Sequence, residues 1–346
     1  MFQIKRIVFI LLILSFSVFE TFGGGQNRAG TAGAPELRIP VGARYLSMVG
    51  APIAITSGLE AIYYNPAGVD LTSNSASALF SYRSYIADMN MNYIAVSGKL
   101  GDIGSLGLSF RSLNIGDINV TTMDEPDGTG AIFSPGYFVI GLTYSKQLTD
   151  RVSVGANLNF VNENIDRVSA NTFCFDIGVQ YQNVLDVHGL AIGVVVKNLG
   201  PQITYDGNAL YVNADDPTSD RGPDYYKIEA ASAELPSEIS IGLSYETKID
   251  DKNGLSTSFA FTNNNYAYDE YKFGAEYKFD NLLYVRAGYN WTPQATEDVP
   301  YIFQNYALGL GLNFKQFTDL DLALDYAYVP VKYFDANHVF SISLGF

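Results

Sequence analysis

The chain has 346 residues and a formal net charge of −15, from 36 acidic and 21 basic side chains. This charge repels a phosphate backbone, so we expect no nucleic-acid partner. Hydrophobic residues make up 47% of the chain, yet the mean hydropathy of +0.05 is too low for a bundle of membrane helices. The single cysteine, Cys174, excludes an intramolecular disulfide framework.

The amino-terminal residues have the pattern of a secretory signal peptide. Two basic residues precede an apolar run over 7–19, which is interrupted only by two serines. This run is shorter than the about 20 residues that a membrane-spanning helix needs. Small residues at 21 and 23 suit cleavage before residue 24. We therefore expect residues 1–23 to be removed on export; a membrane anchor is the weaker alternative.

Residues 24–74 do not alternate and are predicted to form a compact plug. Ser57 and Glu60 have the spacing of a capping box, which predicts a short helix. The element Asn65-Pro66-Ala67-Gly68 predicts a helix stop and a turn into the first strand, because the residue before proline disfavours helix. Irregular backbone at membrane depth is tolerated only inside protein or a lumen, so a barrel mouth is the natural place for this segment.

From residue 75 to the carboxyl terminus, apolar residues alternate with small or polar ones. About 14 segments show this period, each near the roughly 10 residues with which a tilted strand crosses a bilayer. The predicted strands are 75–86, 90–100, 103–116, 134–148, 151–164, 170–182, 188–199, 236–248, 253–263, 269–279, 282–291, 303–314, 318–327 and 337–346.

The connections between these segments differ in length. Those after even-numbered segments are tight, as at 101–102 and 280–281, whereas most others, such as 117–133 and 200–235, are long and polar. The first hairpin, near 86–89, is an exception. Short periplasmic turns and long extracellular loops are typical of outer-membrane barrels, which predicts that both termini are periplasmic. A soluble β-sandwich is the alternative, but it gives no reason to sort loop lengths.

The last segment ends on an aromatic residue at the carboxyl terminus. Its apolar face is similar to the signal read by the barrel assembly machinery, and consists of Phe340, Ile342, Leu344 and Phe346. A strand protein in lipid must close on itself, because an open sheet leaves unpaired backbone groups. The predicted fold is therefore all-β, a 14-stranded antiparallel transmembrane β-barrel over residues 75–346 with an amino-terminal plug.

Charged residues on the opposite faces of the strands are predicted to point into the lumen. A lysine or arginine facing lipid at the bilayer midplane costs about 2–4 kcal/mol. The residues concerned are Asp176, Lys197, Glu246, Lys272, Glu276, Arg286, Asp321 and Asp325. A salt-bridged interior around the plug is the favoured interpretation, and a polar conduction path is the alternative.

Catalytic and metal chemistry find little support. The two histidines, His188 and His338, are isolated, and neither a Gly-x-Ser-x-Gly elbow nor a His-Glu-x-x-His helix is present. The acidic stretch 124–128 lacks the full pattern of a calcium loop. We expect no enzyme, no cofactor and no metal site. The aromatic connection 200–235 is predicted to cover the mouth or to meet a partner.

Two sequence runs resemble a known family. Val41-Gly-Ala-Arg-Tyr-Leu-Ser-Met-Val-Gly-Ala51 and Glu60-Ala-Ile-Tyr-Tyr-Asn-Pro-Ala-Gly68 resemble the amino-terminal signature of the PorV/PorQ family. The second run is similar, more distantly, to the hatch of FadL-type long-chain fatty-acid transporters. Both groups are 14-stranded outer-membrane barrels, which fits the whole mature chain. One departure is Val49, where related chains usually have glycine.

The resemblance implies an outer-membrane protein in contact with lipid. PorV-like proteins are accessory barrels of type IX secretion, so it implies a protein partner, either the translocon or the surface-attachment machinery. The alternative function is FadL-like transport, with a hydrophobic small-molecule ligand. Asn65, Pro66, Ala67 and Gly68 map onto the shared plug element, where the resemblance implies a gating role and the residues themselves suggest a structural one.

Overall fold

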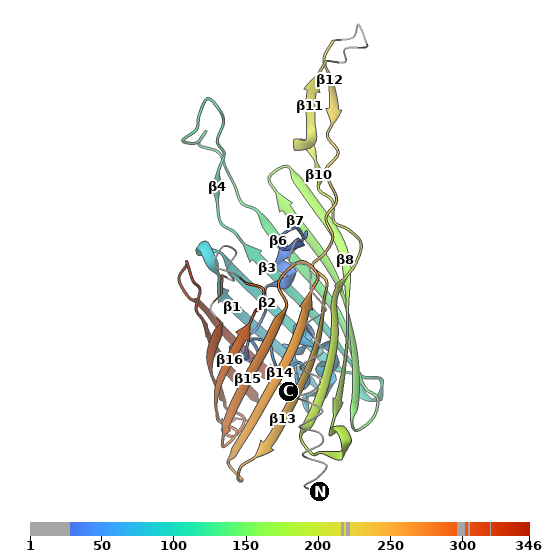
Figure 1. The fold of residues 1–346 in the computed structure, drawn as a ribbon, viewed down its shortest axis with the longest axis vertical. Helices are drawn as coiled ribbons and strands as arrows, with labels where there is room; N and C mark the ends of the chain where they lie inside the picture. Colours follow the sequence, from blue (N-terminus) through green and yellow to red (C-terminus); the bar gives the residue numbers. More distant parts are fainter. Residues whose placement is uncertain (1–27, 216–217, 219–221, 296–301, 304, 319) are drawn as a thin grey trace.

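A single closed barrel dominates the structure (Figure 1). The computed structural model describes residues 28–215, 218, 222–295, 302–303, 305–318 and 320–346. The signal peptide expected at residues 1–23 lies outside the described residues. Among the residues described, no helix is both long and apolar enough to span a bilayer.

Fourteen strands form the barrel wall, and each overlaps one predicted segment, so the predicted fold is confirmed. They are β1 (Ala76–Ser84), β2 (Asn90–Lys99), β3 (Ser105–Asn114), β6 (Gly136–Gln147), β7 (Val152–Ile165), β8 (Val168–Gln182), β9 (Leu190–Leu199), β13 (Glu238–Lys248), β14 (Asn253–Asn264), β15 (Glu270–Phe279), β16 (Leu283–Trp291), β17 (Tyr306–Asn313), β18 (Asp321–Val329) and β19 (Asn337–Gly345). All neighbours are antiparallel, and β19 pairs with β1 to close the ring.

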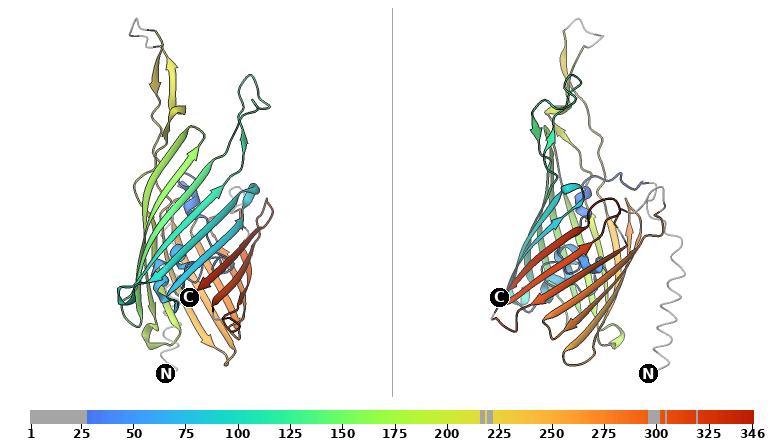
Figure 2. Two further views of the ribbon diagram at one scale, coloured as in Figure 1. Left: turned by 180° about the vertical axis from the view of Figure 1, so that it is seen from behind. Right: turned by 90° about the vertical axis from the view of Figure 1, so that its left-hand side faces the viewer.

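The two ends of the barrel differ. At the tight-turn end, short connections join β2–β3, β6–β7, β13–β14 and β15–β16, and the chain ends there, with Ser75 N donating to Phe346 O. At the long-loop end, two excursions rise far above the wall (Figures 1 and 2). One carries β4 (Ile118–Asn119) and β5 (Ile132–Phe133). The other, residues 200–237, is called the long excursion and carries β10 (Asp206–Gly207), β11 (Tyr211–Ala214) and β12 (Asp224–Lys227).

The outward face of the wall is apolar and uncovered. Alternate side chains such as Leu108, Ile177 and Leu310 are more than half exposed, while their neighbours in sequence point into the lumen. In water such a band would be a severe aggregation hazard, whereas in lipid it is the required surface. The alternation along each strand therefore follows from having lipid on one side and the plug on the other.

The plug lies inside the wall as a string of short helices and turns (Figure 2). Its helices are η3 (Pro35–Arg38), η4 (Leu46–Met48), α2 (Ala61–Tyr64) and η5 (Pro66–Leu71), and the connections of the barrel add η6 (Ile86–Asp88), η7 (Gly101–Ile103), η8 (Val184–Asp186) and η9 (Asn208–Leu210). Leu59, Ile62 and Val69 of the plug pack against Tyr93 and Ala95 of β2. This packing is one of several hydrophobic clusters between the plug and the wall.

The predicted capping box is wrong. Glu60 is itself the N-cap of α2, and its side chain makes no capping bond. Its carboxylate instead accepts hydrogen bonds from Arg44 N (3.3 Å) and Tyr45 N (3.1 Å), and Ser57 lies beside the Tyr45 hydroxyl. The tertiary contact with the preceding turn satisfies more backbone donors than the local cap would, because that turn is buried.

Candidate functional site

The Asn65–Gly68 element fastens the plug to the barrel wall. The fully buried side chain of Asn65 caps η5 by accepting from Ala67 N (3.2 Å). Its amide donates to Ile53 O in the plug (2.9 Å) and to Val179 O in β8 (3.2 Å). One side chain therefore ties two turns of the plug to a barrel strand.

Glycines allow this close approach. A Cβ at Gly178 of β8 would collide with Asn65 Oδ1, and a Cβ at Gly155 of β7 would collide with the backbone of Pro66. Gly68 itself leaves no room for a side chain, because a Cβ there would meet Thr56 O. The element and its two wall strands therefore fit one another only with glycine at these positions.

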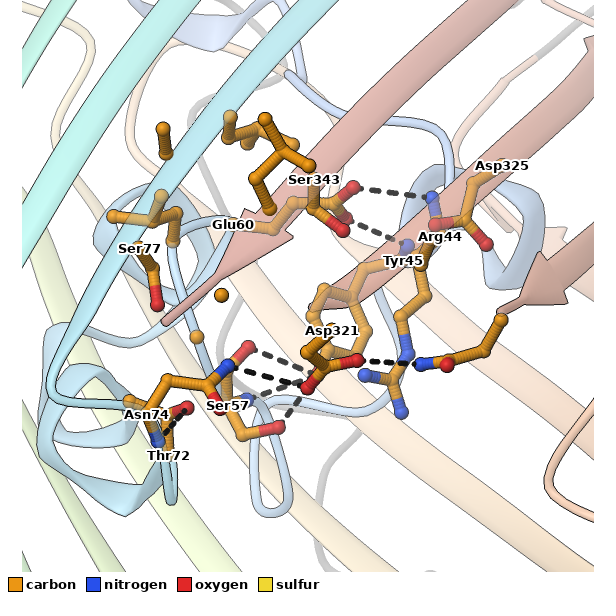
Figure 3. Close-up of a pocket in the computed structure, with 18 of the residues that line it drawn as sticks. Arg44, Tyr45, Ser57, Glu60, Thr72, Asn74, Ser77, Asp321, Asp325 and Ser343 are labelled. Atoms are coloured by element: carbon orange, nitrogen blue, oxygen red, sulfur yellow. Dashed lines mark hydrogen bonds between the residues drawn. The ribbon is translucent and has the colours of Figure 1, made fainter. Parts of the chain in front are cut away.

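A polar cavity of about 210 Å³ lies between the plug and the tight-turn end (Figure 3). Arg286 of β16 pairs with Glu276 of β15 and with Asp325 of β18, each at 2.5 Å, while Arg44 of the plug reaches Glu276 at 3.5 Å. Asp321 accepts from Asn74 (3.2 Å) and Asn313 (2.8 Å). These lumen charges are matched by partners rather than left open to a pore.

Glu60 is a carboxyl of the plug that lines this cavity. Burial and then the nearby Asp325 carboxylate raise the pKa of its carboxyl to about 7, while the two backbone N–H donors and the Arg44 guanidinium oppose the shift. Figure 3 shows Glu60 pointing at the turn that carries Arg44 and Tyr45. The protonation of Glu60 is therefore coupled to the position of this turn.

A second cavity, of about 520 Å³, lies between the plug and the long-loop end. Seven aromatic side chains are among its lining residues: Tyr63, Tyr64, Tyr85, Tyr266, Tyr268, Phe303 and Tyr306. Four basic residues also line it: Lys197 pairs with Glu238 and Lys272 pairs with Glu270, both at 2.8 Å, and Arg38 and Arg83 are the other two. The lining is therefore mixed, with aromatic surface for a hydrophobic group beside charged side chains.

The plug separates the two cavities, which share no lining residue. Tyr45 faces the cavity at the tight-turn end, called the lower cavity, and Tyr64 faces the cavity at the long-loop end, called the upper cavity. Their rings meet edge to face with centroids 5.5 Å apart. Tyr64 also donates to Val41 O at 3.0 Å. Both tyrosines are at most 5% exposed, so this aromatic pair is a buried part of the plug that separates the cavities.

The remaining predicted lumen charges lie in different settings. Asp176 of β8 accepts from Asn157 (3.0 Å), Asn159 (2.8 Å) and Asn198 N (2.8 Å). It sits at an irregularity where β8 and β9 lose register, and Asn198 there has φ of +59°. Glu246 lies at the tight-turn end of β13, and its side chain is exposed. Of the residues predicted to form an assembly signal, Phe340 and Ile342 are exposed on the outer face of β19, Leu344 is half-buried, and Phe346, just beyond β19, is exposed.

The start of the plug is tied to the long excursion, which the sequence did not reveal. Arg28 pairs with Glu234 at 3.0 Å, and both contact the Tyr266 hydroxyl. Gly33 N donates to Glu234 O at 2.9 Å. These residues lie at the long-loop end, whereas Phe346 lies at the tight-turn end. The amino terminus itself lies outside the described residues, so a periplasmic position for both termini stays a prediction.

A buried carboxyl, that of Glu36, lies beside this junction. Glu36 of η3 is 3% exposed, and its pKa is raised to about 8 by burial and then by the neighbouring Glu163 carboxylate of β7. Glu163 accepts from the hydroxyl of Tyr205 in the long excursion at 2.5 Å. Sequence reasoning missed Glu36, although a lone carboxylate in an apolar run was a usable signal.

The hairpin of β11 and β12 rises above the barrel wall (Figure 1). Within the described residues, these two strands pair with each other and with no other strand, and Lys227 pairs with Asp206 at 2.6 Å at the base of the hairpin. Tyr225 is 72% exposed and Ile228 is 52% exposed, and acidic side chains accompany them. An isolated two-stranded hairpin is marginally stable in water, so an exposed one that carries aromatic residues indicates a contact surface.

Comparisons with known proteins agree with this architecture. The family model described as type IX secretion system protein PorV matches residues 23–218. A CymD monoaromatic hydrocarbon channel superposes with a TM-score of 0.55 at 14% identity, covering 88% of this chain and 97% of that one. A Pseudomonas aeruginosa FadL homologue gives 0.50 at 13% identity, covering 85% and 95%. At these identities the likeness shows the fold alone. No curated protein sequence matches the chain.

Proposed function

The chain belongs to the PorV family of type IX secretion system proteins, and from this premise we propose that it is a docking subunit whose long excursion holds the secretion machinery. It is an outer-membrane β-barrel, and the family implies partners in that machinery. The observation that carries the proposal is the free, aromatic β11–β12 hairpin raised above a plugged lumen.

The contacts between the plug and the wall favour a docking function over conduction through the lumen. Asn65 and its glycines fix the plug to β7 and β8, and the Tyr45–Tyr64 pair separates the two cavities. The lumen charges around the lower cavity pair with one another. A barrel with these contacts serves best as a rigid platform, since moving the plug would expose several buried charges.

The partner's surface is apolar and basic in this proposal. Exposed aromatic rings on the hairpin match an apolar patch, and the nearby carboxylates of Asp215, Asp224 and Glu229 match lysines or arginines. The outer edges of β11 and β12 also have backbone groups that can pair with an added strand. We place the translocon or the surface-attachment machinery here.

The proposal includes the orientation of the barrel in the outer membrane and the division of the chain into segments. The tight-turn end and Phe346 face the periplasm, and the excursions face outward, as short turns and long loops do in other barrels. Residues 1–23 form the signal peptide, 24–74 the plug and 75–346 the barrel. The face with Phe340, Ile342, Leu344 and Phe346 acts as the assembly signal.

Co-purification tests the proposal. The full chain is isolated from native membranes beside a variant in which residues 208–230 are replaced by a short Gly-Ser linker. The proposal predicts that secretion components accompany the full chain and are lost with the variant, while both barrels fold. Recovery of the full chain without partners, or equal recovery with both chains, contradicts it.

The upper cavity favours a second candidate function. Its aromatic lining fits a hydrophobic small molecule, and the CymD structure bears the description monoaromatic hydrocarbon channel. In this alternative the chain admits such a compound through the barrel. Deleting the gene would then slow uptake of a hydrophobic compound; unchanged uptake, with secretion impaired, would leave docking as the function.

A further inference from the structure

Connections at the tight-turn end expose apolar side chains. Turns of this kind are usually built from glycine, asparagine, aspartate and serine, each for its backbone preference. Here the exposed positions also include large apolar residues, namely Ile103 (64% exposed), Leu148 (54%), Leu185 (70%), Ile249 (61%) and Phe317 (69%). We call these five residues the apolar rim.

Backbone preference does not explain the apolar rim. Leu185 has φ of 52° and ψ of 32°, a left-handed conformation that asparagine or glycine adopts more readily than leucine. Leu185 is also 70% exposed, so burial within the described chain does not account for a leucine at this position.

The apolar rim surrounds the barrel rather than occupying one sector. Its members lie in the connections β2–β3, β6–β7, β8–β9, β13–β14 and β17–β18. Phe346, 60% exposed, continues it where β19 meets β1. A protein partner covers one side of such a ring, whereas a flat bilayer contacts every connection at once.

The apolar rim is continuous with the lipid-facing wall. Tyr144 lies on the lipid-facing side of β6 near its tight-turn end, and its hydroxyl donates to Ile103 O at 2.6 Å. Tyr181 and Tyr245 occupy the corresponding outward positions of β8 and β13, and tyrosine is the residue of the headgroup level. Lys99 and Lys248 are exposed at the same end, where ammonium groups attract lipid phosphates.

We propose that the apolar rim is immersed in the phospholipid leaflet at the tight-turn end, with anionic headgroups beside its lysines. The inference rests on the proposed orientation only for the name of that leaflet, which is then the periplasmic one. The immersed rim anchors the depth of the barrel all round, and it leaves the long-loop end as the face that is open to proteins.

Tryptophan placement tests the proposal in vesicles of phosphatidylethanolamine and phosphatidylglycerol. The single native tryptophan is removed (Trp291→Phe), and Leu185→Trp or Phe317→Trp is added; Met123→Trp, at the fully exposed tip of the other excursion, is the control. Lipids brominated near the headgroup should quench the rim tryptophans roughly twofold more than the control, with blue-shifted emission. Quenching by aqueous acrylamide as strong as in the control would overturn the proposal.

A cysteine variant separates lipid from protein as the cover. Phe317→Cys in a Cys174→Ser background is exposed to a membrane-impermeant maleimide that reaches both faces of opened membranes. Slow labelling in native membranes and in pure lipid vesicles supports immersion. Labelling that is slow in native membranes and fast in pure lipid identifies a protein cover and overturns the proposal, while leaving docking by the long excursion intact.

Discussion

The side-chain oxygen of Asn65 occupies the space in which a side chain at Gly178 would begin. The plug and β8 are therefore specified together by two residues more than a hundred positions apart. Asn65 uses the space to bond three backbone groups, Ala67 N, Ile53 O and Val179 O. These hydrogen bonds fasten the Asn65–Gly68 element to the barrel wall.

Gly178→Val should destabilise the barrel by about 1–3 kcal/mol, the usual range for overpacking, because the new side chain would collide with the buried side chains of Asn65 and Pro66. The loss of heat-resistant mobility on gels measures this. Gly136→Val in β6 is the matched control, since a Cβ there meets nothing within 4 Å. Equal loss in both variants would show that Asn65 is irrelevant.

Arg286→Met should destabilise the barrel by about 3–5 kcal/mol, because it leaves the Glu276 and Asp325 carboxylates buried without their cation. Urea unfolding in vesicles measures the change. Lys252→Met, which removes an exposed pair with Asp280 at 3.8 Å, should cost less than about 1 kcal/mol. Similar midpoints for the two variants would contradict a paired interior.

Glu36→Gln should flatten the pH dependence of stability. The pKa of Glu36 is raised from 4.5 to about 8, so its favourable contribution is complete below pH 4.5 and is lost as the pH rises toward 8. The variant should therefore be the more stable protein at pH 9 and differ least at pH 4. Thermal midpoints at both pH values provide the measurement, with the half-exposed Glu234→Gln as the control. A parallel shift at both pH values would exclude ionisation as the cause.

Phe346→Ser should lower the amount of folded barrel in the membrane several-fold while leaving the thermal midpoint of the folded fraction nearly unchanged. The side chain is exposed on the outer face of the barrel, where it contacts the surrounding lipid rather than the core. Phe334→Ser, an exposed phenylalanine at the long-loop end, is the control. A lowered midpoint with normal amounts would assign Phe346 to stability instead of assembly.

The strands could be predicted from the sequence because lipid and plug impose alternation on every crossing. All fourteen were located, since a single misplaced charge such as Arg286 facing outward would cost about 2–4 kcal/mol. The family was also recognisable, because Asn65–Gly68 needs these residue types to cap η5 and turn the chain.

Tertiary contacts between distant residues could not be predicted. The Glu60 carboxylate accepts hydrogen bonds from the backbone of Arg44 and Tyr45 instead of capping its helix. The spacing of residues along the sequence does not encode this contact. Arg28 contacts Glu234, which is 206 positions away in the sequence. The sequence pattern therefore could not show at which end of the barrel the plug begins. The β11–β12 hairpin was missed because its residues follow no lipid-imposed period.

Site-specific photocrosslinking tests the docking account most directly. A photoreactive phenylalanine replaces Tyr225 on the exposed hairpin or, as a control, Leu185 at the opposite end, and cells are irradiated before the membranes are opened. The account predicts a crosslink from position 225 to a component of the type IX secretion machinery and none from position 185. Crosslinks from position 185 alone, or none to that machinery from position 225 in a correctly folded barrel, would contradict it.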